Sequence, residues 1–298
     1  MFSENAHRSP TETRDVRAQA MTQIPPISTN PSRRGLLIAT ALIGSARFGA
    51  GTFSSRAATP GETAGIKALV FDIQGTVVDY HAPLVEIGTA INERNGLAID
   101  WTKVSSEWVG GVAAIVGPIA AGRQAWMPVS RIFQLALQEV LKRQDPADQI
   151  SEKDRIELMS VWSKMRPWPD SLPGIARLKQ RYTVAALSNG GMAGIIHVSK
   201  AGGLPFDAVL TGELAKAYKP APEVYGLAVD YLGFPADQIM MVAAHKWDLK
   251  GAKAAGLKTA FIPRPGENGS STEVNLDPEP FIDIMAGDLG DLAAKLGA

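Results

Sequence analysis

From residue 65 onward, short apolar runs alternate with segments of helical periodicity, and this alternation limits the fold more than any other feature of the sequence. The pattern is typical of a parallel β-sheet whose strands are joined by crossover helices. The predicted strands cover residues 67–71, 182–187, 207–210, 239–243 and 258–262. The helices expected between them cover residues 193–201, 223–232 and 249–255. A glycine closely follows each helix and is the usual stop signal. The sequence therefore predicts an α/β fold with a Rossmann-like parallel sheet.

The segment at residues 82–168 interrupts this alternation. It has no comparable strand-like run, and its apolar residues recur at helical spacing. Examples are Ile132, Phe133, Leu135, Ala136, Val140 and Leu141. The Pro-Trp-Pro sequence at 167–169 then marks the return to the sheet. We therefore expect a helical cap domain at 82–168, inserted into an α/β core made of residues 65–81 and 169–298.

The first 64 residues differ in character and are rich in Ser, Thr, Pro and Ala. They contain the pair Arg33-Arg34, with a serine before it and an apolar run at residues 36–46 after it, as in a twin-arginine export signal. The run is too short to cross the ~30 Å hydrocarbon core of a bilayer as a helix. The sequence thus predicts a signal segment and a periplasmic protein without stable membrane insertion. A disordered basic extension on a cytoplasmic protein is the alternative.

Charge and cysteine content exclude several classes of function. The chain has 30 Lys and Arg against 30 Asp and Glu, so no net field attracts nucleic acid or an anionic membrane. It has no cysteine, which excludes disulfides, thiolate nucleophiles and Cys-ligated zinc. A small-molecule substrate is the expected partner, and any catalysis must come from oxygen and nitrogen groups. The oligomeric state is not determined by the sequence, and a homodimer stays open.

Four apolar runs end in polar residues, which in chain order are Asp72, Ser188, Lys219 and Asp248. In open α/β sheets the ligand crevice lies at the carboxyl ends of the strands, so polar residues at these places are site candidates. Each also has a simpler interpretation. Asp72 could cap the loop after its strand, Asp248 could be the N-cap of its helix, and Lys219 could be a surface lysine in a turn. Their order along the chain favours a common site.

These residues stand in four motifs that resemble the haloacid dehalogenase superfamily and, within it, the type II 2-haloacid dehalogenases. The motifs are Asp72-Ile73-Gln74-Gly75-Thr76, Leu187-Ser188-Asn189-Gly190, Lys219-Pro220-Ala221-Pro222-Glu223-Val224-Tyr225 and Met241-Val242-Ala243-Ala244-His245-Lys246-Trp247-Asp248. The resemblance covers about residues 68–263. It implies a Rossmann-like core with an inserted helical cap, and a hydrolytic site at the strand ends.

The resemblance also implies a catalytic role for Asp72, since a carboxylate can attack an electrophilic carbon and form a covalent ester. The carboxylate must be ionised, which the charge of Lys219 and hydrogen bonds from Ser188, Asn189 and backbone N–H groups would favour. Asp248 would orient Lys219 or the hydrolytic water. The catalytic candidates are Asp72, Lys219, Asp248, Ser188, Asn189 and Thr76.

Two positions separate a dehalogenase from a phosphatase. Phosphatases of this superfamily hold Mg²⁺ and usually carry an acid two residues after the nucleophile and another before the last motif aspartate. This chain has Gln74 and Ala244 there, and Mg²⁺ needs carboxylates to supply charge. We therefore expect a metal-independent dehalogenase without a cofactor, which converts small 2-haloacids to 2-hydroxy acids through an ester on Asp72. A Mg²⁺-dependent phosphatase and a binding protein without turnover stay open as alternatives.

The expected substrate-binding residues depart from the family pattern. Family members usually carry Trp-Arg early in the cap, whereas Trp108 is followed here by Val109. Arg123, later in the cap, is the candidate replacement, with a solvated surface arginine as the alternative. Gln74 takes the place of the usual aromatic residue and makes the expected halide site more polar.

In the fourth motif, the usual Ser and Asn correspond to Ala243 and His245. His245 could donate to halide or assist water, and a local hydrogen bond is the alternative. Tyr225 fits either the site or the core, and Trp247 fits either the pocket wall or packing. The substrate-binding candidates are Tyr225, His245, Gln74, Arg123 and Trp247.

Overall fold

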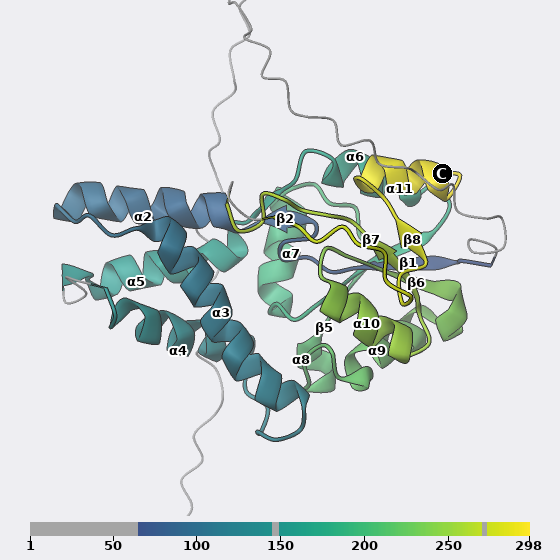
Figure 1. Ribbon diagram of the computed structural model, residues 1–298, viewed down its shortest axis with the longest axis horizontal. Coiled ribbons are helices and arrows are strands. Elements are labelled where there is room, and N and C mark those ends of the chain that lie inside the picture. The colour runs from purple at the N-terminus through teal and green to yellow at the C-terminus, as the bar shows by residue number, and fades with distance from the viewer. Residues whose placement is uncertain (1–64, 145–148, 270–272) are drawn as a thin grey trace, which may run out of the picture. The chain divides into compact units, whose positions relative to one another are not determined.

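The computed structural model describes residues 65–144, 149–269 and 273–298, so the predicted export signal lies outside the described residues. A six-stranded sheet forms the core, with the strand order β5-β4-β1-β6-β7-β8 and every neighbouring pair parallel (Figure 1). The strands are β1 (Ala68–Phe71), β4 (Thr183–Ser188), β5 (Ala208–Thr211), β6 (Ile239–Ala243), β7 (Lys258–Phe261) and β8 (Ile284–Met285). The predicted α/β fold with a parallel sheet is confirmed.

Both faces of the sheet are buried, as expected for parallel strands covered by helices. In β1, Leu69 and Phe71 belong to one apolar cluster, and Ala68 and Val70 to another on the opposite face. The first face is covered by α6 (Ser171–Leu178), α7 (Met192–Ala201) and α11 (Leu289–Lys295). The second is covered by α9 (Pro222–Leu232) and α10 (Lys246–Ala254). In Figure 1, α6 and α11 lie above the sheet and α9 and α10 below it.

The five predicted strands match β1 and β4 to β7 to within about one residue at each end. Three short strands were not predicted. Ile284 and Met285 form β8 at the edge of the sheet, and β2 (Val78–Asp79) pairs antiparallel with β3 (Arg166–Pro167). Two residues are too few to produce an alternating pattern, so such strands depend on their tertiary partners. The remaining short elements are α8 (Gly212–Ala215) and η3 (Ala236–Gln238).

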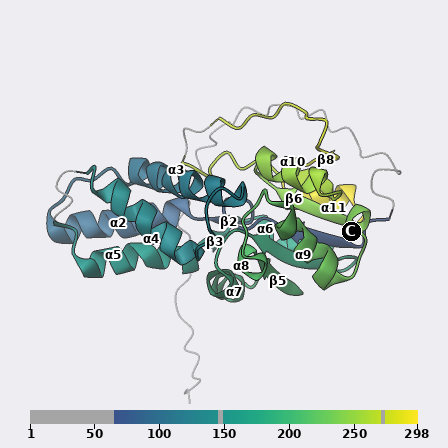
Figure 2. The same ribbon diagram turned by 90° about the horizontal axis from the view of Figure 1, so that it is seen from below.

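The chain between β2 and β3 is helical. It forms α2 (His81–Asn95), α3 (Trp101–Ala120), α4 (Val129–Leu141), α5 (Glu152–Met159) and the short 3₁₀ helix η2 (Ser160–Ser163). These helices lie together beside the sheet in both views (Figures 1 and 2). They occupy the segment for which the sequence predicts a cap, whereas the exact limits of cap and core stay a prediction. No helix in the described parts of the chain is both long and apolar enough to cross a bilayer.

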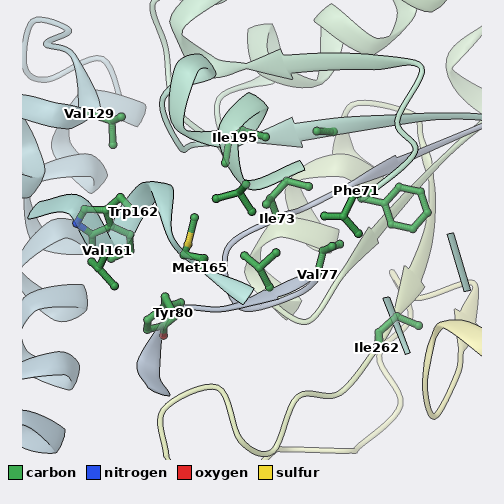
Figure 3. Close-up of a cluster of buried hydrophobic side chains, with 14 of the residues drawn as sticks. Phe71, Ile73, Val77, Tyr80, Val129, Val161, Trp162, Met165, Ile195 and Ile262 are labelled. Atoms are coloured by element: carbon green, nitrogen blue, oxygen red, sulfur yellow. The ribbon is translucent and has the colours of Figure 1, made fainter. Parts of the chain in front are cut away.

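Apolar side chains fill the space between the end of β1 and the helical segment (Figure 3). Ile73 and Val77 follow β1 and belong to the same cluster as Trp162 and Met165, which end the helical segment. The ring of Trp162 stacks on Phe133 with centroids 4.0 Å apart. This continuous packing fixes the turn that follows β1, and with it the residues that begin the candidate site.

Candidate active site

Asp72 directly follows β1, and its two carboxylate oxygens have different partners. Oδ1 accepts a hydrogen bond from the Lys219 ammonium, with Nζ 2.9 Å away. Oδ2 accepts from the Thr76 hydroxyl at 2.8 Å and lies 2.9 Å from Nδ1 of His245. Only 6% of Asp72 is exposed. The first and third motifs therefore meet at this carboxylate, as the sequence predicts.

Lys219 bridges two carboxylates. Its Nζ lies 2.9 Å from Asp72 Oδ1 and 2.5 Å from Asp248 Oδ2, and the side chains of Lys219 and Asp248 have no exposed surface. The hydroxyl of Tyr225 donates to Asp248 Oδ1 at 2.8 Å. Tyr225 is itself fully buried, so it is both a core residue and a partner of the site. The surface-lysine interpretation is wrong, because the ammonium lies between the two acids.

Asp248 does not cap its helix. Helix α10 begins after His245, which is the N-cap residue, and Asp248 lies in the first turn with its carboxylate on Lys219. In residues 65–144, 149–269 and 273–298, no backbone N–H donates to the Asp72 carboxylate as a loop cap would require; its donors there are Lys219, Thr76 and His245. Both carboxylates therefore face the ammonium.

Burial and charge together set the ionisation of this group. Burial alone would raise the pKa of Asp72, but the charge of Lys219 and the hydrogen bond of His245 outweigh it and hold the pKa below its usual range. Burial would lower the pKa of Lys219, but the charges of Asp248 and Asp72 raise it above its ordinary value. Burial raises the pKa of Asp248, and the charge of Asp72 adds to this effect. Asp72 is therefore a carboxylate, and Lys219 an ammonium, at neutral pH.

Ser188 and Asn189 lie at the end of β4, but their hydrogen bonds differ from the expected ones. The Ser188 hydroxyl accepts from the backbone N–H of Gly190 at 2.9 Å. The Asn189 side chain accepts from the Lys219 backbone N–H at 2.7 Å and donates to its carbonyl at 3.2 Å. Short polar side chains readily bond to nearby backbone groups. Within the part of the chain that the structure describes, neither side chain hydrogen-bonds to Asp72. Asn189 instead fixes the backbone that carries the lysine.

Thr76 connects the first and fourth motifs. Its hydroxyl donates to Asp72 and accepts from the backbone N–H of Ala244 at 2.9 Å. The backbone carbonyl of Thr76 accepts from the guanidinium of Arg264 at 2.8 Å. One residue therefore ties the end of β1 to the end of β6 and to the loop after β7.

The structure adds Glu267, which the sequence did not indicate. It lies in the loop after β7, and its Oε1 is 2.8 Å from Nε2 of His245. The residues after Arg264 show neither periodicity nor a motif, so only proximity in the folded chain reveals the contact. Burial would lower the pKa of His245, but hydrogen bonds to Asp72 and Glu267 outweigh it and raise the pKa to about 10. His245 is therefore a cation beside Asp72.

The other substrate-binding candidates lie in different places. Gln74 is half-buried, and its Oε1 would lie 3.3 Å from a Cβ at Gly190. Trp247 is 49% exposed, with its ring centroid 5.7 Å from that of His245, so it is not a core packing residue. Arg123 is exposed after the end of α3, and within the described residues it forms no ion pair. The structure does not bring Arg123 to Asp72.

The donor set at Asp72 does not fit Mg²⁺. Lys219 lies between Asp72 and Asp248, where a cation bound by both acids would have to sit. Gln74 and Ala244 add no carboxylate. Across residues 65–144, 149–269 and 273–298, no group of three or more His, Asp or Glu side chains is arranged to hold a metal ion. An ammonium supplies the positive charge here.

Comparison with known proteins agrees with this geometry. Residues 66–256 match the family model for haloacid dehalogenase-like hydrolases. The chain is 30% identical over 211 residues to (S)-2-haloacid dehalogenase 4A of Burkholderia cepacia, covering 67% of this chain and 84% of that protein. It is 27% identical over 210 residues to (S)-2-haloacid dehalogenase H-109 of Pseudomonas putida, covering 67% of this chain and 87% of that protein.

Solved structures give the same result. The L-2-haloacid dehalogenase PA0810 is 34% identical with a TM-score of 0.72, and the match covers 78% of this chain and 100% of that one. The defluorinating L-2-haloacid dehalogenase Rha0230 is 31% identical with a TM-score of 0.73, and the match covers 83% of this chain and 99% of that one. The chain therefore belongs to the haloacid dehalogenase-like hydrolase family. The resemblance inferred from its four motifs is confirmed.

Proposed function

We propose that the protein is a hydrolytic dehalogenase of small 2-haloacids, which it converts to 2-hydroxy acids through an ester on Asp72 and without a metal. One observation carries the proposal: the ionised Asp72 carboxylate shares the Lys219 ammonium with Asp248 at 2.9 and 2.5 Å. A carboxylate held by an ammonium keeps its charge and can act as a nucleophile toward carbon.

In the first step, an oxygen of Asp72 attacks the carbon that carries the halogen. A carbon–oxygen bond forms, the carbon–halogen bond breaks, and the halide leaves with the bonding electron pair. Water then attacks Cγ of the ester, and cleavage of the Cγ–oxygen bond releases the hydroxy acid. One proton of the water goes to the product hydroxyl and the other to solvent. The reaction thus returns Asp72 as a carboxylate.

The neighbouring residues have distinct proposed roles. Lys219 holds Asp72 in its ionised form, Asp248 and Tyr225 position the lysine, and Asn189 fixes its backbone. Thr76 orients the second oxygen of Asp72. Ser188 is proposed to shape the turn after β4 through Gly190.

The substrate side is proposed from exposure and from the relatives. His245 is partly exposed next to Asp72, Trp247 is exposed beside the His245 ring, and Gln74 is half-buried beside Gly190. These residues are suited to form the polar wall of the substrate site, whereas the exposed position of Arg123 argues against it as the substitute for the family arginine. The relatives' names specify the S or L enantiomer, and we propose the same preference here.

The test is halide release from the separate enantiomers of 2-chloropropanoate and 2-bromopropanoate, with EDTA or with added Mg²⁺. p-Nitrophenyl phosphate serves as the phosphatase substrate in parallel. EDTA-resistant halide release from the S enantiomer is the expected result. Mg²⁺-dependent phosphate release would favour the phosphatase alternative instead. Turnover of neither class would favour a binding protein or another substrate.

Export and assembly stay proposals as well. We propose that residues 1–64 direct the chain through the twin-arginine route to the periplasm, on the strength of Arg33-Arg34 and the apolar run after them. Replacing both arginines by lysine should retain the protein in the cytoplasm, as measured by cell fractionation. A homodimer is tested by light scattering of the purified chain.

A further inference from the structure

Oδ2 of Asp72 has an unusual set of partners. It accepts from the Thr76 hydroxyl at 2.8 Å and faces Nδ1 of His245 at 2.9 Å, while among the described residues the one donor to Oδ1 is Lys219. Nε2 of the same imidazole lies 2.8 Å from Glu267. Because both ring nitrogens face carboxylates, both must carry protons for both hydrogen bonds to form. The contacts by themselves thus define an imidazolium between two acids.

Residues from several elements hold Glu267 in its position. A Cβ at Gly75 would lie only 2.1 Å from Glu267 Oε1, so the glycine leaves room for this carboxylate. The Tyr80 hydroxyl lies 3.3 Å from the same oxygen. Arg264 anchors the start of the loop through two hydrogen bonds to Asp170, at 2.7 and 2.9 Å. The contact with His245 is therefore fixed from several elements.

The charged and titratable groups nearest to His245 and its two carboxylate partners come from several elements. Asp72 follows β1, Glu267 lies in the loop after β7, and Tyr80 precedes α2. Lys219 is the other cation and contacts Asp72 on its opposite oxygen. The imidazole is 23% exposed, compared with none of the lysine, so water can reach its side of Asp72.

We propose that Glu267 is a positioning residue which keeps His245 protonated, so that His245 and Thr76 together stabilise the negative charge on Asp72 Oδ2 during hydrolysis of the ester. This inference rests on the proposed dehalogenase function. Oδ1, which accepts from Lys219 and not from this pair of donors, is then the oxygen that attacks the substrate. Preorganised donors at the oxygen that gains charge are an effective means of catalysis in acyl transfer.

In this step, water oxygen bonds to Cγ, and the electron pair of the carbonyl bond moves to Oδ2. His245 and Thr76 donate to that oxygen, and His245 keeps its proton throughout. The carbonyl bond then re-forms as the bond between Cγ and Oδ1 breaks, which leaves Oδ1 on the product. A neutral imidazole would provide a weaker donor, since hydrogen bonds from charged donors are about twice as strong.

The first test follows the charge of His245 without turnover. The chain has four histidines, and the His245→Asn variant assigns the His245 signal in a ¹⁵N NMR titration. In the wild-type protein His245 should stay protonated at pH 8, and in Glu267→Gln its titration should move to lower pH. Glutamine keeps an acceptor for Nε2–H, so the contact geometry is preserved. Titration at the same pH in both proteins would overturn the proposed role of Glu267.

The second test separates ester formation from ester hydrolysis. In Glu267→Gln, we expect a rapid burst of about one halide per site followed by turnover about tenfold slower than wild type. Mass spectrometry after rapid quenching should detect the ester on Asp72. The kcat of Glu267→Gln should fall further as pH rises, because the imidazolium that remains in this variant then loses its proton. Glu279→Gln is the matched control. Glu279 belongs to the same C-terminal segment as Glu267 but lies outside the site, 3.9 Å from Lys246.

The outcomes separate the two proposals. In one outcome, the wild-type protein releases halide and Glu267→Gln slows the burst and the later turnover equally. This result would overturn the oxyanion role alone. Absence of halide release from the wild-type protein would overturn the dehalogenase function and that role with it. The NMR titration would then still decide whether Glu267 holds the charge of His245.

Discussion

The two sides of the Asp72 carboxylate are built differently. On the Oδ1 side, Lys219 and Asp248 have no exposed side-chain surface, and every partner comes from a motif visible in the sequence. On the Oδ2 side, His245 and Glu267 are 23% and 15% exposed, and Glu267 comes from a loop without a motif. The buried side fixes the charge of the nucleophile, whereas the open side can exchange protons with solvent.

This difference has an energetic consequence. A fully buried ion group cannot lose one member without leaving an unpaired charge that water cannot reach, which typically costs about 3–5 kcal/mol. A partly exposed pair loses less, because solvent replaces the missing partner. Changes on the Lys219 side should therefore affect folding and catalysis together, and changes on the His245 side mainly catalysis and its pH dependence.

The largest effect is expected at the residue the two sides share. Asp72→Asn removes the nucleophile and should lower halide release at least about a thousandfold. The amide is nearly the same size, so the circular dichroism spectrum should stay that of the folded protein. Halide assays and thermal melts check both expectations. Activity near the wild-type level would rule out nucleophilic catalysis by Asp72.

Lys219→Met tests the buried side. It leaves Asp72 and Asp248 facing each other without a cation, so the free energy of unfolding should fall by about 3–5 kcal/mol and activity should be lost. Denaturant titration measures the first effect. Lowering the pH should recover part of the stability, because protonation removes the repulsion. Lys103→Met, at a side chain 64% exposed beside Glu107, is the control and should leave stability nearly unchanged.

His245→Asn tests the open side through pH. The folded-state pKa of His245 is raised to about 10, so its stabilising effect is fully present below the unfolded-state value of 6.5 and is lost as pH rises toward 10. The wild-type protein should therefore lose stability across this window, and the variant should lose less. Thermal melts at pH 6 to 10 measure the difference. Identical slopes would mean that His245 is neutral in the folded protein.

The smallest effect is expected from Tyr80→Phe. It removes hydroxyl contacts to Glu267 at 3.3 Å and to Asn268 at 2.8 Å but leaves the Glu267–His245 pair in place. Stability should fall by about 1 kcal/mol, as for the loss of one partly buried hydrogen bond. Halide release should change less than in Glu267→Gln. If Tyr80→Phe lowered halide release more than Glu267→Gln does, Tyr80 and not Glu267 would control the charge of His245.

Much of the fold could be predicted because the signals are local. The apolar runs that became β1 and β4 to β7 are continuous in sequence, and the helices after them end near glycines. The Asp72, Lys219 and Asp248 group could be predicted because the three residues stand in recognisable motifs that follow core strands, and parallel topology brings such segments together at one edge of the sheet.

The partners of these residues could not be predicted in the same way. Ser188 and Asn189 stand in an intact motif, yet their side chains bond to Gly190 and to the Lys219 backbone. Arg123 has the right chemistry for a substrate residue but lies exposed after α3. Which atoms a polar side chain contacts depends on its rotamer and on competing donors nearby, and residue order does not record either.

The sequence by itself determined the sheet, the inserted helices and the carboxylate with its lysine, because hydrophobic periodicity and motif spacing act over short stretches of chain. Only the tertiary structure decided that Glu267 meets His245. That contact joins positions 22 residues apart, and it requires the turn held by Arg264 and the space left at Gly75. An irregular loop has no hydrophobic periodicity from which its contacts could be predicted. Such a contact can therefore be identified only in the folded chain.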